Sequence, residues 1–410
     1  MITNIKINEG MLKNIFFFDG KKSLFLENIL IFMIVLIQYF SGLKMFNFSY
    51  YFIGEEQLKN VILVFLLFFL FIGNCYASTD SAYEYVLMDM TTGKVLQGKN
   101  YRKPMLIASI TKIMTCLLAV ESEKLDEEVI VDDVIKQSYG SGIYIEVDEK
   151  ILLRDLLYGL MLRSGNDAAL MVAKYVGGSV EEFVAMMNDK AKEIGMSQTR
   201  FSNPSGLDNT DSGNYSTAYD MALLTRYAMR YSWYRKIVAT SKHVVRTNKK
   251  TYVWHNKNKL LKESYITGGK TGYTEKAKRT LVSTASSANL NLVVVTIKDS
   301  DDWNTHKSLY QYAFNHYTAY PVLKKKTFQV VGEKFYRSSG KLYIKNDVYL
   351  PLKNEIKGNL VGKVVLEKKK KVHNHEKVGY YAIYLDKKLL YQEDIYFQKK
   401  KTKISLGRSF

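Results

Sequence analysis

A serine and a lysine three residues apart, within this 410-residue chain, form a pair whose types and spacing could do chemistry. They are Ser109 and Lys112, and the apolar residues that follow them predict the start of a buried helix, with both side chains on one face. A serine hydroxyl becomes a good nucleophile when a neighbouring base takes its proton. A lysine can be that base if burial and nearby cations lower its pKa. The backbone N–H groups at a helix start can also help to hold a developing oxyanion.

Two further polar clusters follow at wide spacing, and each has an ordinary structural interpretation. Ser164 and Asn166 flank a glycine before an expected helix, where Ser164 could serve only as the helix cap. Lys270, Thr271 and Gly272 stand together and could be no more than a turn with a surface lysine. The first cluster alone is equally compatible with a solvated helix face. The functional interpretation therefore depends on whether the fold brings the three clusters together.

The pattern of strands and helices between residues 81 and 318 predicts how these clusters are positioned. Apolar or alternating runs predict strands near both ends of the region, at residues 83–88, 94–96, 266–273, 280–285 and 290–297. Helical spacing predicts helices at residues 109–125, 152–161, 168–176, 180–194, 217–229 and 304–316. This order implies an α+β fold whose first strands pair with its last. Such a sheet would bring the Ser109 helix, the Ser164 loop and the Lys270 strand to one place.

The first 77 residues are predicted to lie outside the globular part of the chain. They contain two apolar runs, and the second, at residues 61–72, follows a lysine and precedes a small-x-small ending at Ala77. This combination is typical of a secretory signal peptide. We expect cleavage after Ala77; the alternatives are a lipoprotein site at Cys75 and a core helix. The residues before the signal imply that Met45 is the real start or that the first run is an additional membrane segment.

The C-terminal part, residues 321–410, is predicted to be a separate small all-β domain. Its expected strands are residues 328–331, 342–344, 348–350, 361–366 and 380–385, and its tail, residues 396–410, is expected to be basic and nearly structureless. The chain has a formal net charge of +19, and this part holds about 22 Lys and Arg against about 8 Asp and Glu. Such a charge favours an anionic partner. Because the chain is expected to be exported and its lysines show no aromatic-interleaved stripe, we predict no nucleic acid among its partners.

The remaining residues with reactive or metal-binding side chains give no further site. The chain has two cysteines, too few for a disulfide framework, and Cys116 is expected to be an ordinary buried thiol. Its six histidines have no metal-ligand spacing, so we predict neither a metal nor a cofactor. Asp167 and Asp220 are interpreted as charges at helix starts rather than as catalytic acids.

The three polar clusters, in this order and at these separations, resemble those of the penicillin-recognising serine enzymes, the DD-peptidases and serine β-lactamases. Those enzymes have Ser-x-x-Lys, then Ser-x-Asn about 50 residues on, then Lys-Thr-Gly about 100 further. The stretches at residues 203–208, 215–220 and 256–261 look like the low-molecular-mass D-alanyl-D-alanine carboxypeptidases. The resemblance covers about residues 80–318, and residues 321–410 more loosely. It implies a DD-peptidase domain over residues 78–318, an antiparallel sheet flanked by helices with a helical subdomain, followed by a small basic all-β domain.

The resemblance implies a role for each residue of the first two clusters. Ser109 would attack the carbonyl of the penultimate D-alanine of a peptidoglycan stem pentapeptide, release the terminal D-alanine and form an acyl-enzyme. Lys112 would be the general base, Ser164 would relay a proton to the leaving amine, and Asn166 would hydrogen-bond the substrate amide. Water would then deacylate the enzyme.

The resemblance also assigns the third cluster to substrate binding. Lys270 would place a positive charge beside the first lysine and, with Thr271, would bind the substrate's terminal carboxylate. Gly272 would let the substrate backbone lie close along the strand. The backbone N–H groups of Ser109 and Tyr273 would form the oxyanion hole. Many relatives have histidine where this chain has Tyr273, so local substrate contacts can differ there.

Two competing functions follow from the same residues. A class A serine β-lactamase needs a glutamate about 35 residues after Ser-x-Asn to drive water onto the acyl-enzyme. Residues 201–208 occupy that region and hold no glutamate, so penicillin should acylate Ser109 and stay there as an inhibitor. The second alternative is a catalytically inactive cell-wall-binding protein that uses the basic C-terminal domain, but three intact clusters argue against it.

The expected location is outside the cytoplasm, at the cell membrane or in the cell wall. The carboxypeptidases that the chain resembles usually end in an amphipathic helix that lies on the membrane. Residues 395–410 carry positive charge but too little apolar surface for such a helix. We therefore expect at most peripheral contact with the membrane or an anionic wall polymer, or tethering by an uncleaved N-terminus.

Overall fold

The structure is a computed structural model and describes residues 81–208, 213–328, 330, 334–354, 360–367, 369 and 371–400. All of them belong to one compact unit of the chain, residues 76–410. The expected signal peptide, its cleavage after Ala77 and the apolar runs before it lie outside the described residues. No helix of the described part is both long enough and apolar enough to cross a membrane.

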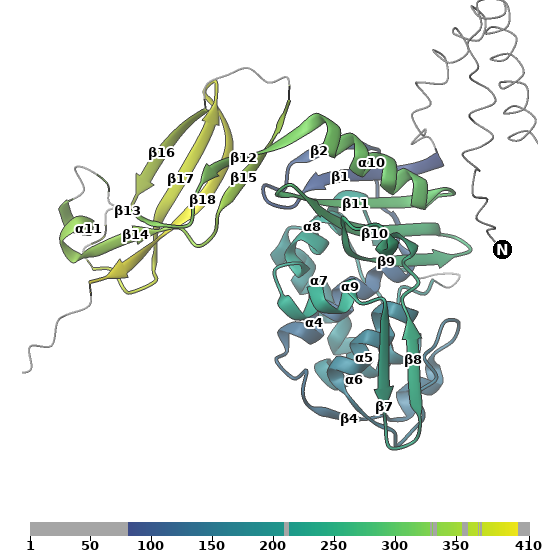
Figure 1. Cartoon of the computed structure of the whole chain (residues 1–410). Helices are drawn as coiled ribbons and strands as arrows, with labels where there is room; N and C mark the ends of the chain where they lie inside the picture. The colour runs from purple at the N-terminus through teal and green to yellow at the C-terminus, as the bar shows by residue number, and fades with distance from the viewer. Residues whose placement is uncertain are drawn as a thin grey trace, which may run out of the picture. The chain divides into compact units, whose positions relative to one another are not determined.

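A five-stranded antiparallel sheet organises the larger part of the fold (Figure 1). The strand order is β2-β1-β11-β10-β9, with bounds β1 (Ala82–Asp89), β2 (Val95–Lys99), β9 (Ile266–Thr274), β10 (Lys278–Ser287) and β11 (Leu290–Asp299). β1 pairs along its length with β11, for example Val86 with Val295. This confirms the prediction that the first strands pair with the last. It also leaves β9, the strand of Lys270, at the edge of the sheet.

Both faces of the sheet are covered, because apolar side chains of β1, β10 and β11 point both ways. On one face, Leu87, Leu281 and Val294 pack against α10 (Asp302–His316). On the other face, Val86 and Val282 join a larger core formed with the helices. Two-sided burial explains why the middle of β1, residues 85–88, and of β11, residues 292–295, is continuously apolar instead of alternating.

The helices of the second face lie between β3 and β9 in the chain (Figure 1). They are η2 (Ala108–Thr111), α4 (Lys112–Glu121), η3 (Asp133–Gln137), α5 (Leu153–Tyr158), η4 (Gly159–Arg163), α6 (Asn166–Gly177), α7 (Val180–Ile194), α8 (Ala218–Ala228) and α9 (Ser232–Ala239). The short turn η5 (Lys259–Lys262) instead packs Leu260 into the core on the α10 face. Side chains of α7 and α8 cap their own first turns: Ser179 Oγ accepts from the N–H of Glu182, and Thr217 Oγ1 from that of Asp220. α4 is buried on nearly all sides, as its sequence predicted.

Among the described residues, three short two-stranded sheets complete this part, and none of them was predicted from the sequence. They pair β3 (Met105–Leu106) with β6 (Tyr215–Ser216), β4 (Glu128–Ile130) with β5 (Lys150–Leu152), and β7 (Lys242–Arg246) with β8 (Thr251–His255). The β7–β8 hairpin alternates buried and exposed side chains, but its many charged residues conceal this pattern.

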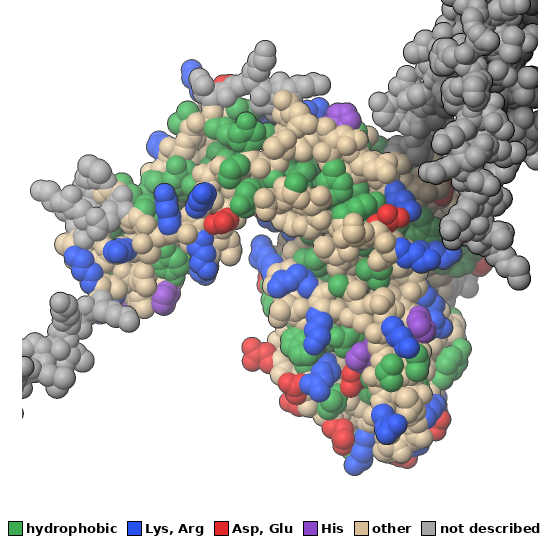
Figure 2. Space-filling model, in the orientation of Figure 1, with side chains coloured by type: hydrophobic (Ala, Val, Ile, Leu, Met, Phe, Trp, Pro, Cys, Tyr) green, Lys and Arg blue, Asp and Glu red, His purple; other side chains and the backbone are tan. Residues whose placement is uncertain are grey.

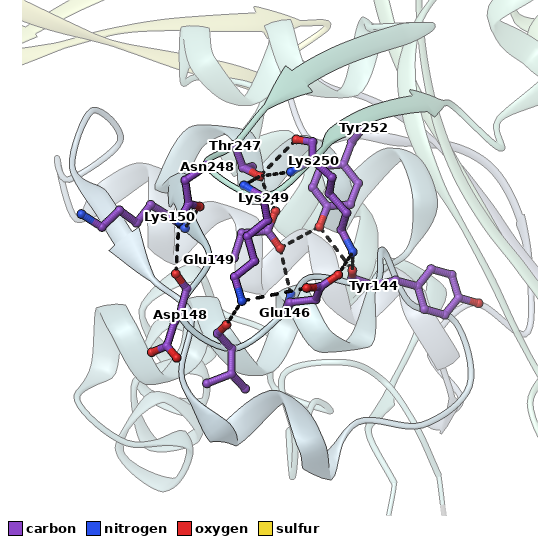
Figure 3. Close-up of polar contacts among 11 residues, drawn as sticks. Tyr144, Glu146, Asp148, Glu149, Lys150, Thr247, Asn248, Lys249, Lys250 and Tyr252 are labelled. Carbon is purple, nitrogen blue, oxygen red and sulfur yellow. Dashed lines mark hydrogen bonds and ion pairs between the residues drawn. The ribbon is translucent and has the colours of Figure 1, made fainter.

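The tip of the β7–β8 hairpin is locked to the loop before β5 by a buried carboxylate (Figure 3). Glu149 is fully buried and accepts three hydrogen bonds. Its donors are the N–H of Glu146 at 2.8 Å, Oγ1 of Thr247 at 2.6 Å and Oη of Tyr252 at 2.8 Å. A buried carboxylate is tolerated when its oxygens are hydrogen-bonded, so this residue joins two segments about 100 positions apart in the sequence.

The described residues of the C-terminal part form two small antiparallel sheets. β12 (Tyr317–Leu323) pairs with β15 (Val348–Lys353), and the larger sheet has the order β13-β14-β18-β17-β16. Its strands are β13 (Thr327–Phe328), β14 (Gly340–Tyr343), β16 (Leu360–Leu366), β17 (Lys377–Leu385) and β18 (Lys388–Lys399), with one short helix, α11 (Lys334–Ser339). Lys and Arg side chains are visible across the face of this part in Figure 2.

One prediction for the C-terminal part is wrong. Residues 396–399 belong to β18 and are not part of a structureless tail, because Phe397 is buried opposite Leu342 of β14. Because charged residues surround Phe397 in the sequence, its buried position was not apparent from the composition of this segment. Residues 401–410 lie outside the described part.

The buried Glu149 gives a stability prediction. Glu149→Ala removes the shortest hydrogen-bond acceptor of Thr247 and Tyr252 and leaves an empty buried site, and their other acceptors lie at 3.1 and 3.2 Å, so we expect a loss of about 2 to 4 kcal/mol. In thermal unfolding this corresponds to a fall in Tm of roughly 5 to 15 °C. The control Glu128→Ala removes an exposed carboxylate whose ion pair with Lys150 spans 3.7 Å, and should change Tm little. Equal Tm values for the two variants would contradict the assignment of Glu149 as a structural lock.

Candidate active site

Ser109 lies on a tight turn rather than on a regular helix. The predicted helix start is instead the 3-10 turn η2, and α4 begins only at Lys112. Side chains three residues apart come into line on a 3-10 turn, and Lys112 Nζ lies 3.1 Å from Ser109 Oγ. Thr280 of β10 ties the turn to the sheet, because its Oγ1 donates to the carbonyl of Ile107. The local structure at Ser109 thus differs from the predicted helix start, but the side chains of Ser109 and Lys112 still lie together as expected.

The loop after α7 presses against this turn and supplies an acceptor to it. Lys112 Nζ donates to the carbonyl of Ser205 at 2.6 Å. The next residue, Gly206, has φ +85°, and a Cβ at this position would overlap the carbonyl of Ala108. Asn203 Oδ1 shapes the loop by accepting from the N–H groups of Ser205 and Gly206. The close approach therefore requires glycine, which explains part of the 203–208 pattern.

Lys112 is fully buried, and its three polar neighbours suit a neutral amine. Its Nζ donates to the carbonyl of Ser205 and, at 2.7 Å, to Oδ1 of Asn166. The third neighbour is the Ser109 hydroxyl, which can donate as well as accept. A neutral amine has two N–H donors and one lone pair, so two oxygen acceptors and one hydroxyl satisfy it completely. In this arrangement the lone pair faces the serine proton.

Ser164 contacts Lys270 and does not cap the helix that follows it. It ends the π-helical turn η4 with φ +66°, whereas the N-cap of α6 is Gly165, without a side-chain cap bond. Lys270 Nζ donates to Ser164 Oγ at 3.0 Å. A non-glycine residue in the left-handed region is uncommon, and such strain clusters at functional sites. The capping interpretation of Ser164 is therefore excluded.

Asn166 connects the lysine to a second loop. Its Oδ1 accepts from Lys112, its Nδ2 donates to the carbonyl of Tyr139 at 2.6 Å, and its backbone N–H donates to the carbonyl of Ser141 at 2.7 Å. The side-chain amide has a second N–H and a second lone pair. One N–H of Asn166 therefore remains for a ligand carbonyl.

The third cluster follows the edge strand β9. Lys270 is almost fully buried, and its Nζ also donates to the carbonyl of Thr271 at 2.6 Å. A Cβ on Gly272 would lie 2.9 Å from the backbone nitrogen of Ser109, so only glycine lets β9 pass this close to the turn. Tyr273 is the next residue, and its side chain is 54% exposed. The structure thus brings all three clusters to one place, as the sequence predicted.

Two amines are buried side by side in this site, and their pKa values are lowered as a result. Burial lowers the pKa of Lys112 to about 7, and the charge of Lys257 adds to the effect while Asp167 opposes it. Burial also lowers the pKa of Lys270 well below its ordinary value, with help from the charges of Lys112 and Lys257. Neutral Lys112 is therefore accessible near pH 7, which a general base requires.

Sequence reasoning missed Lys257 as part of this site. Its backbone N–H donates to the carbonyl of Leu162 at 3.1 Å, and its Nζ reaches Oγ of Ser141 at 3.5 Å. Burial and the neighbouring charge of Arg163 lower its own pKa. A single lysine in a polar loop carries no signal of its own. The sequence indicated this region only through the resemblance of residues 256–261 to the carboxypeptidases.

The two predicted helix-start aspartates have structural roles. The carboxylate of Asp167 accepts from the backbone N–H groups of Ile143 at 3.0 Å and Tyr144 at 2.6 Å. Asp220 accepts from the N–H of Gln198 at 2.9 Å and from Oγ1 of Thr199 at 2.8 Å. Both side chains hold neighbouring loops against helix starts, and neither contacts Ser109.

Within the residues that the structure describes, no group of three or more His, Cys, Asp or Glu side chains could hold a metal ion. Cys116 is fully buried, and burial raises the pKa of its thiol. The site's chemistry therefore rests on a hydroxyl nucleophile, two amines, a second hydroxyl and an amide. This set can transfer an acyl group from a substrate to Ser109.

Comparisons with known proteins agree with this chemistry. The model of the family described as D-alanyl-D-alanine carboxypeptidase matches residues 75–301, and that of the penicillin-binding protein 5 C-terminal domain matches residues 320–403. The D-alanyl-D-alanine carboxypeptidase DacF of Bacillus subtilis is 33% identical over 289 residues, covering 66% of this chain and 74% of its own length. DacC of Escherichia coli is 29% identical over 272 residues, covering 62% and 66%.

Solved structures give the same result. Penicillin-binding protein 5 from Haemophilus influenzae superposes with a TM-score of 0.63 at 25% identity, covering 78% of this chain and 97% of its own. The D-alanyl-D-alanine carboxypeptidase of Mycobacterium tuberculosis H37Rv superposes with a TM-score of 0.55 at 29% identity, covering 57% and 91%.

The charge of Lys257 gives a prediction for the site. Lys257→Gln removes a positive charge that disfavours protonation of Lys112, so the pKa of Lys112 should rise from about 7. Carbon-13 NMR titration of lysine-labelled protein, with the Lys112 signal assigned by Lys112→Arg, measures this pKa. The control Lys259→Gln removes a nearby exposed lysine and should leave the pKa unchanged. An equal shift in both variants, or none in Lys257→Gln, would argue against a local effect of Lys257.

Proposed function

Because the chain belongs to the D-alanyl-D-alanine carboxypeptidase family, we propose that it removes the terminal D-alanine from peptidoglycan stem pentapeptides through an acyl-enzyme on Ser109. One observation carries the proposal: buried Lys112 lies 3.1 Å from Ser109 Oγ and has a pKa lowered to about 7. A serine beside a neutral buried base is the minimum that acyl transfer needs.

The acylation step follows from these contacts. Lys112 takes the hydroxyl proton as Ser109 Oγ attacks the carbonyl carbon of the penultimate D-alanine. The oxygen of the tetrahedral intermediate then accepts from the backbone N–H groups of Ser109 and Tyr273. Ser164 passes its proton to the leaving amine, and the proton that Lys112 took from Ser109 returns to Ser164. Free D-alanine departs, and Lys112 is neutral again.

Substrate binding uses the edge strand and the remaining polar groups. An extended peptide can lie along β9, where Gly272 leaves room for its backbone. Lys270 and Thr271 bind its terminal carboxylate, and the free N–H of Asn166 meets a substrate carbonyl. Water attacks the acyl-enzyme in the second half of the reaction, with Lys112 again as base.

Penicillin is expected to act as a persistent acylating inhibitor. Residues 201–208 hold no glutamate to activate water, and the carbonyl of Ser205 in this loop accepts from Lys112. This contact disfavours the alternative of a serine β-lactamase. The alternative of a catalytically inactive wall-binding protein is also disfavoured, because binding alone does not require a lysine with a lowered pKa such as that of Lys112.

The domain organisation and location form part of the proposal. We propose a signal peptide within residues 1–77, a catalytic domain over residues 78–318 and a basic β domain over residues 321–410. The substrate requires export to the outer face of the cell membrane or to the cell wall. The basic domain supports peripheral contact with acidic lipid or anionic wall polymer.

The first test is the intact mass of residues 78–410 after brief exposure to benzylpenicillin. The wild type should carry one persistent penicilloyl group, and Ser109→Ala should carry none while it keeps its Tm. Release of D-alanine from a pentapeptide should likewise be lost in Ser109→Ala. An adduct that disappears as penicillin is hydrolysed would favour the lactamase, and no adduct on folded protein would leave the binding module.

The pH dependence of acylation tests the role of Lys112. The base must be neutral, so the rate of acylation by benzylpenicillin should rise as pH increases through about 7 and level off above it. Well below this pH the rate should fall about tenfold per unit. Stopped-flow measurement between pH 5.5 and 9, in roughly half-unit steps, records the profile. A rate independent of pH across this range would falsify the assignment of Lys112 as the base.

A further inference from the structure

The loop at residues 139–144 presents two exposed aromatic rings beside the candidate active site. Tyr139 is 58% exposed and Tyr144 is 75% exposed. The carbonyl of Tyr139 accepts from Asn166, which itself contacts Lys112. A relay of three contacts therefore leads from Ser109 Oγ to this loop, and its first residue lies within roughly 10 Å of the nucleophile.

The backbone of the loop is fixed, although its two rings are free. Asn166 at the start of α6 donates to the carbonyl of Ser141, and the Asp167 carboxylate accepts from the N–H of Tyr144 at 2.6 Å. On the other side, Lys250 Nζ donates to the Tyr144 carbonyl at 2.7 Å, and Tyr252 Oη does so at 3.2 Å (Figure 3). In Figure 3 the Tyr144 ring points away from all of these contacts.

Neither the backbone nor the packing accounts for a tyrosine at position 144. The residue has φ +62°, a conformation that glycine or asparagine adopts at lower cost. An aromatic ring that is 75% exposed also contributes little to the core. A strained, rigidly held and exposed ring on the loop that contacts Asn166 is a reason to look for a ligand.

The chemistry beside Tyr144 suits a saccharide. A tyrosine ring offers an apolar face with a polar edge, and the C–H face of a pyranose ring can stack on it. The Lys250–Glu146 ion pair lies next to the backbone of Tyr144, and its side chains are 34% and 54% exposed, so sugar hydroxyls find charged partners there. A purely apolar ligand would make no hydrogen bond to Lys250 or Glu146.

The expected substrate carries a sugar that can reach this loop. In a stem peptide four residues lie between the scissile bond and the sugar, and when extended they span at most about 14 Å. We infer that Tyr139 and Tyr144 form a subsite for the amino-sugar ring that bears the stem peptide. This inference rests on the proposed function and adds to it a preference for glycan-linked over free peptides.

The test compares D-alanine release from a disaccharide pentapeptide and from the same pentapeptide without sugar. The wild type should show a kcat/KM about three- to tenfold higher with the sugar, as expected for one or two stacking contacts. Tyr144→Asn keeps the left-handed backbone and removes the ring, and should bring this ratio close to one. The matched variant Tyr144→Phe keeps the ring and should keep the ratio. Tyr139→Ala should lower it.

Benzylpenicillin acylation separates this inference from the proposed function. It should be unchanged in both Tyr144 variants, because penicillin carries no sugar. A wild-type ratio of one, an undiminished ratio in Tyr144→Asn, or an equal loss with both substrates would overturn the sugar subsite while the carboxypeptidase stands. A wild type that neither binds penicillin nor releases D-alanine would overturn both.

Discussion

The burial of two lysine amines next to each other is the constraint on which the rest of the site depends. Each ammonium loses hydration on burial, the charge of Lys257 disfavours protonation of both, and the charge of Lys112 disfavours that of Lys270, so the proton equilibrium moves toward the neutral amine. Burial of this kind is costly unless oxygen acceptors replace the lost water. The carbonyls of Ser205 and Thr271, the Ser164 hydroxyl and the Asn166 amide fulfil that need. The surrounding loops can therefore be understood as the means of holding these acceptors.

Those acceptors come from segments that are far apart in the chain, and each segment has its own anchor. Gly206 allows one loop to touch the η2 turn, and Asn203 folds that loop from within. The loop at residues 139–149 is held at one end by α6 and at the other by Glu149 and the β7–β8 hairpin. The helical part thus acts as a frame around Lys112. The sheet contributes Lys270 from the opposite side.

Sequence reasoning recovered the features that depend on local pattern or on motif spacing. The strand and helix order implied that β1 pairs with β11, and the three clusters implied one site. It did not identify residues that act on the site through a backbone carbonyl or through a charge at a distance. The carbonyls of Ser205 and Tyr139 carry no side-chain signal, and Lys257 is one lysine among many. The 3-10 turn at Ser109 was predicted as helix because both structures place polar residues three apart on the same side.

The irregular glycines of β9 have a consequence for what can pair with this edge. Gly268 and Gly269 have φ +153° and +156°, and the register with β10 shifts at this end of the strand. The uninterrupted register with β10 runs from Gly268 to Thr274, and within it the positive φ values end at Gly269. A long strand of another protein would lose its hydrogen bonds at the glycines, whereas a short peptide terminus fits the regular part. The strand thus has a built-in length limit, which protects an open sheet edge from aggregation while keeping it accessible to small ligands.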